Sequence, residues 1–240
     1  PFLLLAALAV SSLASVYAIE HVPGVARDKV TERDDLSRLF AGLPGTFVVR
    51  DLESNETTIV NADRADDSFV PCSTFKILNS LIALELKIVP DVDSPAFPYS
   101  GRPFLVRGRR FLPKECEATL SMRTAFRYSC ITAYQSIAEQ VGPKRYETFI
   151  RKSGLGDAAA IAARPTTFWL EGDYRVSAID QVDFLDRLER GQLPFFKSTV
   201  EQVRDLMVQE RGQDHVLRGK TGYVFSSKPE VGWFVGSVEQ

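Results

Sequence analysis

Two short motifs carry the residue types that nucleophilic catalysis requires. Ser73 and Lys76 stand three positions apart at the start of an apolar run, and Lys220-Thr221-Gly222 lies near the end of the chain. On a helix, this spacing brings the Ser73 hydroxyl and the Lys76 amine to one face. A hydroxyl with a base within reach is the arrangement of a nucleophilic enzyme. Lysine acts as a base near neutral pH only if burial lowers its pKa or chemistry removes its positive charge.

The residues after Ser73 predict such burial. A helix beginning at about Ser73 that is apolar on nearly every side is expected to run through a core. Its first turn also lies in the positive potential of the helix dipole. The alternative is that Ser73 only caps the helix while Lys76 reaches along it to solvent. The apolar positions are Ile77, Leu78, Leu81, Ile82, Ala83, Leu84 and Leu86.

Composition argues against several other chemistries. The chain has only two histidines, His21 and His215, with no metal-ligand spacing around either, so we expect no metal site and no Ser-His-Asp triad. There is no G-x-S-x-G motif. The net charge of -2 is unlike that of a nucleic-acid-binding domain, and we expect Arg107, Arg109 and Arg110 to form a solvated loop.

The first residues resemble an export leader. Residues 2–10 are an apolar stretch of signal-peptide length, and Val16-Tyr17-Ala18 has small residues at the two positions that a signal peptidase reads. The stretch is too short to span a bilayer comfortably, and the alternative is a buried helix. We expect residues 1–18 to be a signal peptide, incomplete at its N-terminus, and residues 19–240 to form one periplasmic or secreted domain without a stable membrane anchor.

Three cysteines in an exported protein leave at least one unpaired. Cys72 and Cys130 each neighbour a candidate catalytic serine, and Cys116 sits in a charged segment. We expect all three to be small buried hydrophobic residues rather than disulfide partners or thiol nucleophiles.

The order of the expected elements predicts an α/β fold of the α+β type. Strands come from both ends of the chain and helices lie between them, so we expect an antiparallel sheet flanked by helices, with an inserted helical lobe. Expected strands cover residues 46–52, 57–60, 216–221 and 232–238. Expected helices cover 34–40, the apolar run from 73, 120–141 with a break near 128–129, 145–152, a segment capped by Ser177, and 199–207.

Five stretches together resemble the class D (oxacillinase-type) serine β-lactamases. The related enzymes with a Ser-x-x-Lys and a Lys-Thr-Gly motif carry a third motif, Ser-Asp-Asn, which Ser129-Cys130-Ile131 replaces here. The resemblance runs from about Gly45 to the end and implies the transpeptidase-like fold of serine β-lactamases and penicillin-binding proteins. The stretches are Gly45-Thr46-Phe47-Val48, residues 69–77, Tyr128-Ser129-Cys130-Ile131, Phe168-Trp169-Leu170-Glu171-Gly172 and Gly219-Lys220-Thr221-Gly222.

The resemblance implies a reaction at Ser73. Ser73 would open the ring of a penicillin-type β-lactam and become acylated. Lys76 would be carbamylated by carbon dioxide or bicarbonate (N6-carboxylysine) and act as the general base of acylation and deacylation, with no other cofactor. Trp169 would donate its indole N–H to the carbamate, and Ile131 and Leu170 would cover it. Trp169 has a simpler alternative as a core residue.

The resemblance also implies how the substrate is held. Ser129 would relay a proton to the leaving nitrogen, and Lys220 and Thr221 would bind the substrate carboxylate. Gly222 would permit the close approach of the strand, and the backbone N–H of Tyr223 would complete an oxyanion hole with that of the nucleophile. Ser129 could instead cap a helix, and Lys220-Thr221 could be an exposed strand edge.

The chain departs from the family pattern in two ways, and the motifs are also compatible with one function other than hydrolysis. Leu155-Gly156-Asp157 replaces the family's usual Tyr-Gly-Asn, which puts the position of the following loop and the substrate profile in question. Family members also continue beyond the position of Gln240 with a strand that carries an arginine and with a closing helix, so we expect a truncated C-terminus. The rival is a β-lactam sensor or penicillin-binding domain that is acylated at Ser73 and turns over slowly.

Overall fold

The computed structural model describes residues 2–6, 29–101, 105–106, 109–110, 112–158, 161, 164–224 and 230–240. Residues 2–6 of the expected leader form a strand, whereas the rest of it, including Val16-Tyr17-Ala18, lies outside these ranges, as does Arg107. The signal peptide therefore stays a prediction. Within the described ranges, none of the helices is long and apolar enough to cross a membrane.

Strands from both ends of the chain form one seven-stranded sheet in the part of the chain that the structure describes. Its order is β2-β4-β3-β1-β9-β8-β7, and all neighbours are antiparallel except the parallel pair of β2 and β4. The predicted fold class is confirmed. The strands are β1 (Phe2–Ala6), β2 (Lys29–Glu32), β3 (Phe47–Asp51), β4 (Glu56–Val60), β7 (Val208–Arg211), β8 (Val216–Val224) and β9 (Val231–Glu239).

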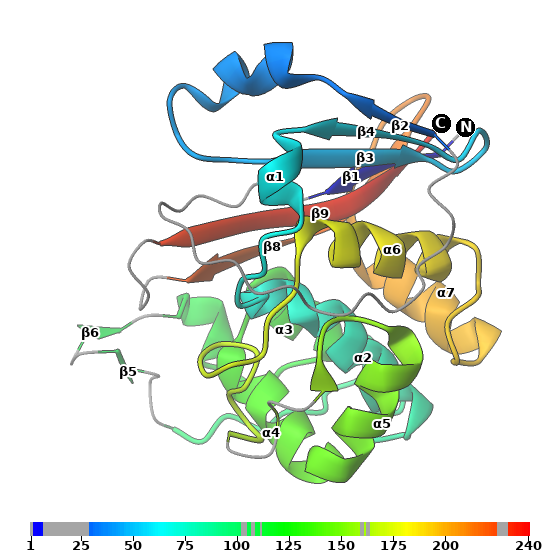
Figure 1. The fold of residues 1–240 in the computed structure, drawn as a ribbon. Helices are drawn as coiled ribbons and strands as arrows, with labels where there is room; N and C mark the ends of the chain where they lie inside the picture. The colour runs from blue at the N-terminus through cyan, green and yellow to red at the C-terminus, as the bar shows by residue number, and fades with distance from the viewer. Residues whose placement is uncertain are drawn as a thin grey trace.

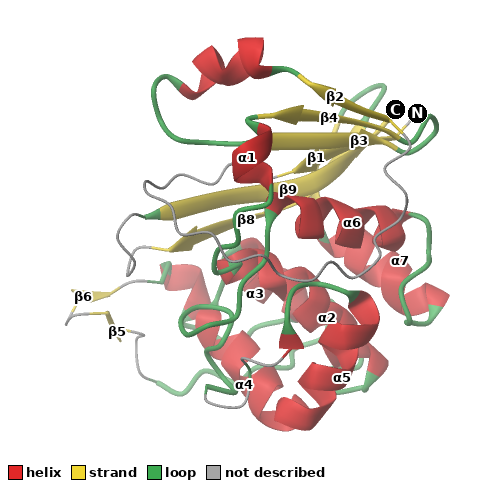
Figure 2. Ribbon diagram, in the orientation of Figure 1, coloured by secondary structure: helices red, strands yellow, loops and turns green. Residues whose placement is uncertain are grey.

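The helices fall into two groups (Figures 1 and 2). α6 (Ala178–Glu189) packs against β1, β3 and β9, and α7 (Lys197–Leu206) lies beside it. The second group is the predicted inserted lobe, which comes from the chain between β4 and β7. It contains α2 (Lys76–Glu85), α3 (Met122–Arg127), α4 (Ile131–Val141) and α5 (Pro143–Ser153).

Shorter elements link these layers. The 3-10 helix η1 (Asp34–Phe40) confirms the expected short helix, and α1 (Ala62–Ala65) follows β4. The 3-10 turn η2 (Cys72–Phe75) leads into α2, and η3 (Lys114–Cys116) precedes α3. β5 (Leu105–Val106) and β6 (Arg109–Arg110) pair as a small antiparallel sheet, so Arg109 and Arg110 lie in a strand and not in the expected loop.

Local sequence features explain where the helices begin and end. The Ser177 side chain accepts a hydrogen bond from the Asp180 N–H at 3.0 Å, and the Asp180 carboxylate accepts one from the Ser177 N–H at 2.8 Å. This is the predicted capping box, which satisfies two free donors at the start of α6. α5 begins at Pro143 and ends at Gly154, whose φ of +58° suits glycine.

The chain around Ser73 differs from the expected regular helix. Ser73 lies in the 3-10 turn η2, and regular α-helix starts only at Lys76. Cys72, which opens the turn, has a left-handed φ of +52°. Its N–H donates to the Trp169 carbonyl at 2.8 Å. The chain therefore enters the helix at a bend held by another loop, and tight 3-10 turns are common at such helix starts.

The expectation for the cysteines is wrong for two of the three. Cys116 and Cys130 form a disulfide across 14 residues of sequence, whereas Cys72 is a free, buried thiol as expected. The pairing depends on η3 lying beside the start of α4, a contact that the spacing of cysteines in the sequence does not reveal.

Candidate active site

Ser73 and Lys76 form a hydrogen-bonded pair at the start of the central helix. The Lys76 Nζ atom donates to the Ser73 Oγ atom at 3.0 Å. Lys76 is fully buried, while Ser73 is half-buried. The alternative in which Lys76 reaches along the helix to solvent is therefore wrong. The pair has the geometry of a nucleophile and its base.

Burial changes the chemistry of Lys76. It lowers the pKa of the Lys76 amine to about 7, with a further contribution from the positive charge of Lys220. The Nζ atom lies 5.0 Å from the centre of the Tyr134 ring, so part of its surroundings is aromatic. With a pKa near 7, much of the amine is neutral at physiological pH. A lysine side chain must be neutral to act as a base.

A second lysine and serine meet through strand β8 and the turn between α3 and α4. The Lys220 Nζ atom donates to the Ser129 Oγ atom at 2.6 Å and to the Thr221 carbonyl at 3.0 Å. Lys220 is 4% exposed, and burial lowers its pKa to about 8. Residues 91 positions apart in the chain thus form a second pair that can pass a proton.

Gly222 explains how β8 comes so close to the Ser73 turn. A Cβ atom at this position would lie 2.9 Å from the Pro71 carbonyl oxygen and 3.1 Å from the Thr74 Cγ2 atom. A side chain there would push the strand and the turn apart, so glycine is required for their contact. The neighbouring Thr221 and Tyr223 are exposed, and the Tyr223 hydroxyl donates to the Glu230 carboxylate.

Trp169 packs beneath the Ser73 turn. Its ring stacks on Phe75 with centroids 5.8 Å apart and an interplanar angle of 15°. The side chain is fully buried, and its Nε1 atom has no hydrogen-bond partner among the described residues. An unpaired buried donor costs about 1–3 kcal/mol, so the indole is suited to an acceptor that binds beside it.

Two apolar residues flank these groups in sequence. Ile131 is 7% exposed and begins α4 directly after Ser129 and Cys130. Leu170 is half-buried and directly follows Trp169. Each is therefore attached to a segment that carries a candidate catalytic side chain.

The structure adds two buried residues that the sequence did not single out. The Gln181 Nε2 atom donates to the Thr74 Oγ1 atom at 2.9 Å, and this hydroxyl donates to the Pro71 carbonyl at 2.7 Å. Both side chains are about 1% exposed. They tie helix α6 to the turn that carries Ser73. In the sequence, this contact is indicated by the polar residue Gln181 at a core-facing position of an amphipathic helix, because buried polar side chains are hydrogen-bonded.

The unusual Leu155-Gly156-Asp157 segment is well supported. Leu155 is buried, and its carbonyl accepts a hydrogen bond from the Tyr174 hydroxyl. Gly156 has a φ of +73°, and a Cβ atom there would lie 2.5 Å from the Arg175 carbonyl oxygen. The glycine is therefore required, and Leu155 contributes an apolar side chain to the core. The described residues contain no cluster of histidine, cysteine, aspartate and glutamate that could hold a metal ion.

Comparisons with known proteins agree on one family. The penicillin-binding protein transpeptidase domain matches residues 45–240. Beta-lactamase OXA-5 of Pseudomonas aeruginosa is 36% identical over 199 residues, which cover 82% of this chain and 71% of the relative. Probable beta-lactamase YbxI of Bacillus subtilis is 33% identical over 200 residues, covering 83% and 71%.

Solved structures agree with these relatives. The class D β-lactamase YbXI from Nostoc has a TM-score of 0.77 and 36% identity, covering 85% of this chain and 82% of its own. The class D β-lactamase FUS-1 (OXA-85) from Fusobacterium nucleatum subsp. polymorphum has a TM-score of 0.75 and 30% identity, covering 88% and 90%.

Proposed function

The chain belongs to the class D β-lactamases, which hydrolyse the β-lactam ring and have the penicillin-binding transpeptidase fold. We propose that the following residues carry out the hydrolysis. Ser73 attacks the ring carbonyl and becomes acylated, and a base at Lys76 then activates the water that releases the product. The observation that carries the proposal is the fully buried Lys76 amine, 3.0 Å from the Ser73 hydroxyl.

We propose that Lys76 works in a carbamylated form. A neutral amine combines with carbon dioxide, and a pKa of about 7 keeps much of Lys76 neutral. The modification supplies an anionic oxygen base in place of an ammonium. The unpaired Nε1 donor of the buried Trp169 would hold the anion, and Ile131 and Leu170 would limit its contact with water. The carbamate would accept the Ser73 proton and release it to the Lys220–Ser129 pair as the ring opens. Unprotonated again, it would accept a proton from water and return it to the Ser73 oxygen when the ester breaks.

Ser129 completes acylation in this proposal. Opening of the ring leaves a basic nitrogen that must be protonated before it departs. Ser129 donates its hydroxyl proton to that nitrogen and recovers one from Lys220, whose Nζ atom already donates to the Ser129 Oγ atom at 2.6 Å. Lys220 and Thr221 also bind the substrate carboxylate, Lys220 through its positive charge.

Two backbone N–H groups stabilise the charge that develops on the carbonyl oxygen. We assign them to Ser73 and Tyr223, which lie on the two segments that Gly222 allows to touch. Such donors are aimed at charge that is present only in the transition state, and losing one typically costs ~10²–10³ in kcat. The glycine thus supports the oxyanion hole by setting the distance between strand and turn.

Turnover in defined bicarbonate tests the base. We expect bicarbonate to raise the steady-state hydrolysis of a penicillin by the wild-type enzyme. Lys76→Ala is expected to lose this turnover and to retain any acyl group on Ser73. The matched control is Lys152→Ala, because Lys152 is an exposed lysine on α5. Full turnover in Lys76→Ala would refute the proposed base, and a wild-type enzyme that stays acylated would indicate the sensor.

We also propose that residues 1–18 are a leader and that the mature chain begins at Ile19, so that β1 (Phe2–Ala6) would be absent from the mature sheet. The support is the apolar run and the small residues at the expected cleavage point. N-terminal sequencing of the exported protein should begin at Ile19. A mature chain that begins before Phe2 would contradict the proposal and keep β1 in the sheet.

A further inference from the structure

The turn between α3 and α4 joins the proposed proton relay to a disulfide. Ser129 is followed directly by Cys130, which pairs with Cys116 in η3. Cys130 is fully buried and Cys116 is 5% exposed. The covalent link therefore begins one residue from the hydroxyl that contacts Lys220.

Ser129 has a backbone conformation that requires support. Its φ is +55°, in the left-handed region that residues with a Cβ atom rarely adopt. Backbone bonds on either side hold the turn, from the Ser129 N–H to the Phe126 carbonyl at 3.2 Å and from the Cys130 N–H to the Ala125 carbonyl at 2.9 Å. Residues in such conformations persist only where the surrounding structure fixes them.

The disulfide holds this turn from both sides. Through Cys130 it anchors the residue after Ser129. Through Cys116, whose Sγ atom lies 3.9 Å from the Tyr128 carbonyl oxygen, it also contacts the residue before. η3 packs against α3, so the anchor is part of the folded lobe.

We propose that the Cys116–Cys130 disulfide is a positioning device for Ser129, which keeps its hydroxyl within reach of Lys220. The inference rests on the proposed role of Ser129 as the proton relay. Breaking the link frees both flanks of the turn, so Ser129 relaxes toward an ordinary φ and its Oγ atom moves away from Lys220. Acylation, which needs the relay, slows, while deacylation at Lys76 continues.

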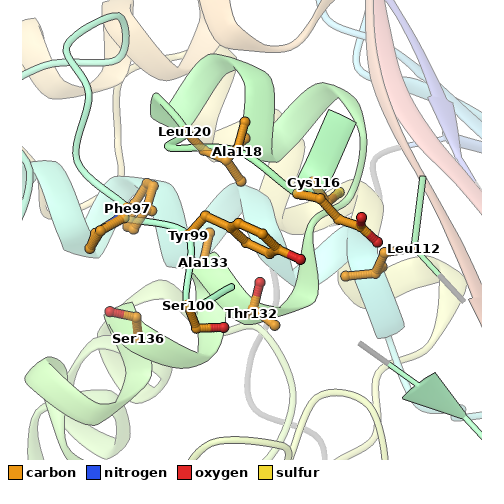
Figure 3. A pocket seen from close by; sticks show the side chains of 12 residues that line it. Phe97, Tyr99, Ser100, Leu112, Cys116, Ala118, Leu120, Thr132, Ala133 and Ser136 are labelled. Atoms are coloured by element: carbon orange, nitrogen blue, oxygen red, sulfur yellow. The ribbon is translucent and has the colours of Figure 1, made fainter. Parts of the chain in front are cut away.

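A cavity borders the disulfide at Cys116. The cavity has a volume of about 200 Å³ and is lined by Cys116 together with Leu112, Tyr99 and Thr132 (Figure 3). Thr132 belongs to α4, the helix that begins after Cys130. Cys116 is the member of the disulfide that lines this cavity, and the lining does not include Ser73, Lys76 or Lys220.

Reversible reduction of the wild-type enzyme tests the proposal without changing its sequence. Tris(2-carboxyethyl)phosphine converts the disulfide into two thiols and becomes a phosphine oxide, whose oxygen comes from water. The reductant is then removed under argon, since it would react with the assay. Alkylation of the unfolded chain should modify one thiol, on Cys72, before reduction and all three cysteines after it.

The measured quantity is the acylation rate per active site, normalised by titrating reactive Ser73 in each sample. We expect reduction to lower kcat/KM about 10- to 100-fold, in line with the cost of misplacing a catalytic group by about 1 Å. Deacylation should be unchanged, and air oxidation should restore the rate. The kcat/KM of Cys116→Ser should equal that of the reduced enzyme and should not change on addition of reductant. Glu115→Gln, an exposed change in the same turn, should have the kcat/KM of the oxidised enzyme.

Two outcomes would overturn the inference. One is an unchanged kcat/KM per reactive Ser73 after complete reduction, which would leave the disulfide a purely stabilising role. The other is an equal loss in acylation and deacylation, which would indicate general loosening of the lobe. Failure of the proposed function is distinguishable, because the oxidised enzyme itself would then fail to turn over a β-lactam.

Discussion

Replacing Trp169 with phenylalanine separates its two contributions to the site. Phenylalanine can still stack on Phe75, whereas the Nε1 donor, which has no partner among the described residues, is lost. If this donor holds a carbamate on Lys76, its removal takes away one hydrogen bond to a charged group. Such bonds contribute about 1.5–3 kcal/mol. The bicarbonate concentration that gives half-maximal turnover should then rise ~10- to 150-fold, since each 1.4 kcal/mol is a factor of ten.

The assay is a bicarbonate titration of kcat at fixed pH, with acylation and deacylation followed separately by burst kinetics. Trp169→Phe should slow deacylation more than acylation, and saturating bicarbonate should restore much of the loss. Trp233→Phe is the matched control, because that indole donates to the Val70 carbonyl at 2.9 Å instead of lacking a partner. A Trp169→Phe enzyme with the wild-type bicarbonate dependence, or an equal shift in both variants, would show that the Trp169 donor does not hold a carbamate.

Two further predictions concern the second strand and the titration of the lysines. Gly222→Ala should lower kcat/KM by ~10², because its Cβ atom would lie 2.9 Å from the Pro71 carbonyl and move β8 from the nucleophile. Gly232→Ala, which has no atom within 4 Å of its new Cβ, should retain wild-type rates, and equal losses would contradict the argument. In limiting bicarbonate, kcat should rise with pH through about 7 as Lys76 loses its proton, and kcat/KM should fall above about 8 as Lys220 loses its charge. A kcat that does not rise through about 7 would contradict the assignment of Lys76, and a kcat/KM that does not fall above about 8 would contradict that of Lys220.

The elements whose pattern is strongly apolar could be predicted from the sequence. The all-round apolar helix α2, the interruption between α3 and α4, and the Ser177 capping box are all found. Burial of Lys76 followed from the same pattern, since a side chain at the start of such a helix has few exposed surfaces.

Edge strands and contacts through space could not be predicted in this way. β2 and β7 are short and mostly exposed, so their residues show no alternation of apolar and polar side chains. The Cys116–Cys130 disulfide spans 14 residues of sequence, and the bond between Gln181 and Thr74 spans 107. The spacing of residues along the sequence contains no information on such pairs.

The most direct test of the catalytic account follows product and enzyme together. The protein is mixed with a chromogenic cephalosporin in bicarbonate buffer, and absorbance is recorded while intact-mass spectra are taken at successive times. We expect sustained colour over many equivalents, with a transient adduct that peptide mapping places on Ser73. A single stoichiometric burst with a persistent adduct, or turnover without any adduct on Ser73, would contradict it.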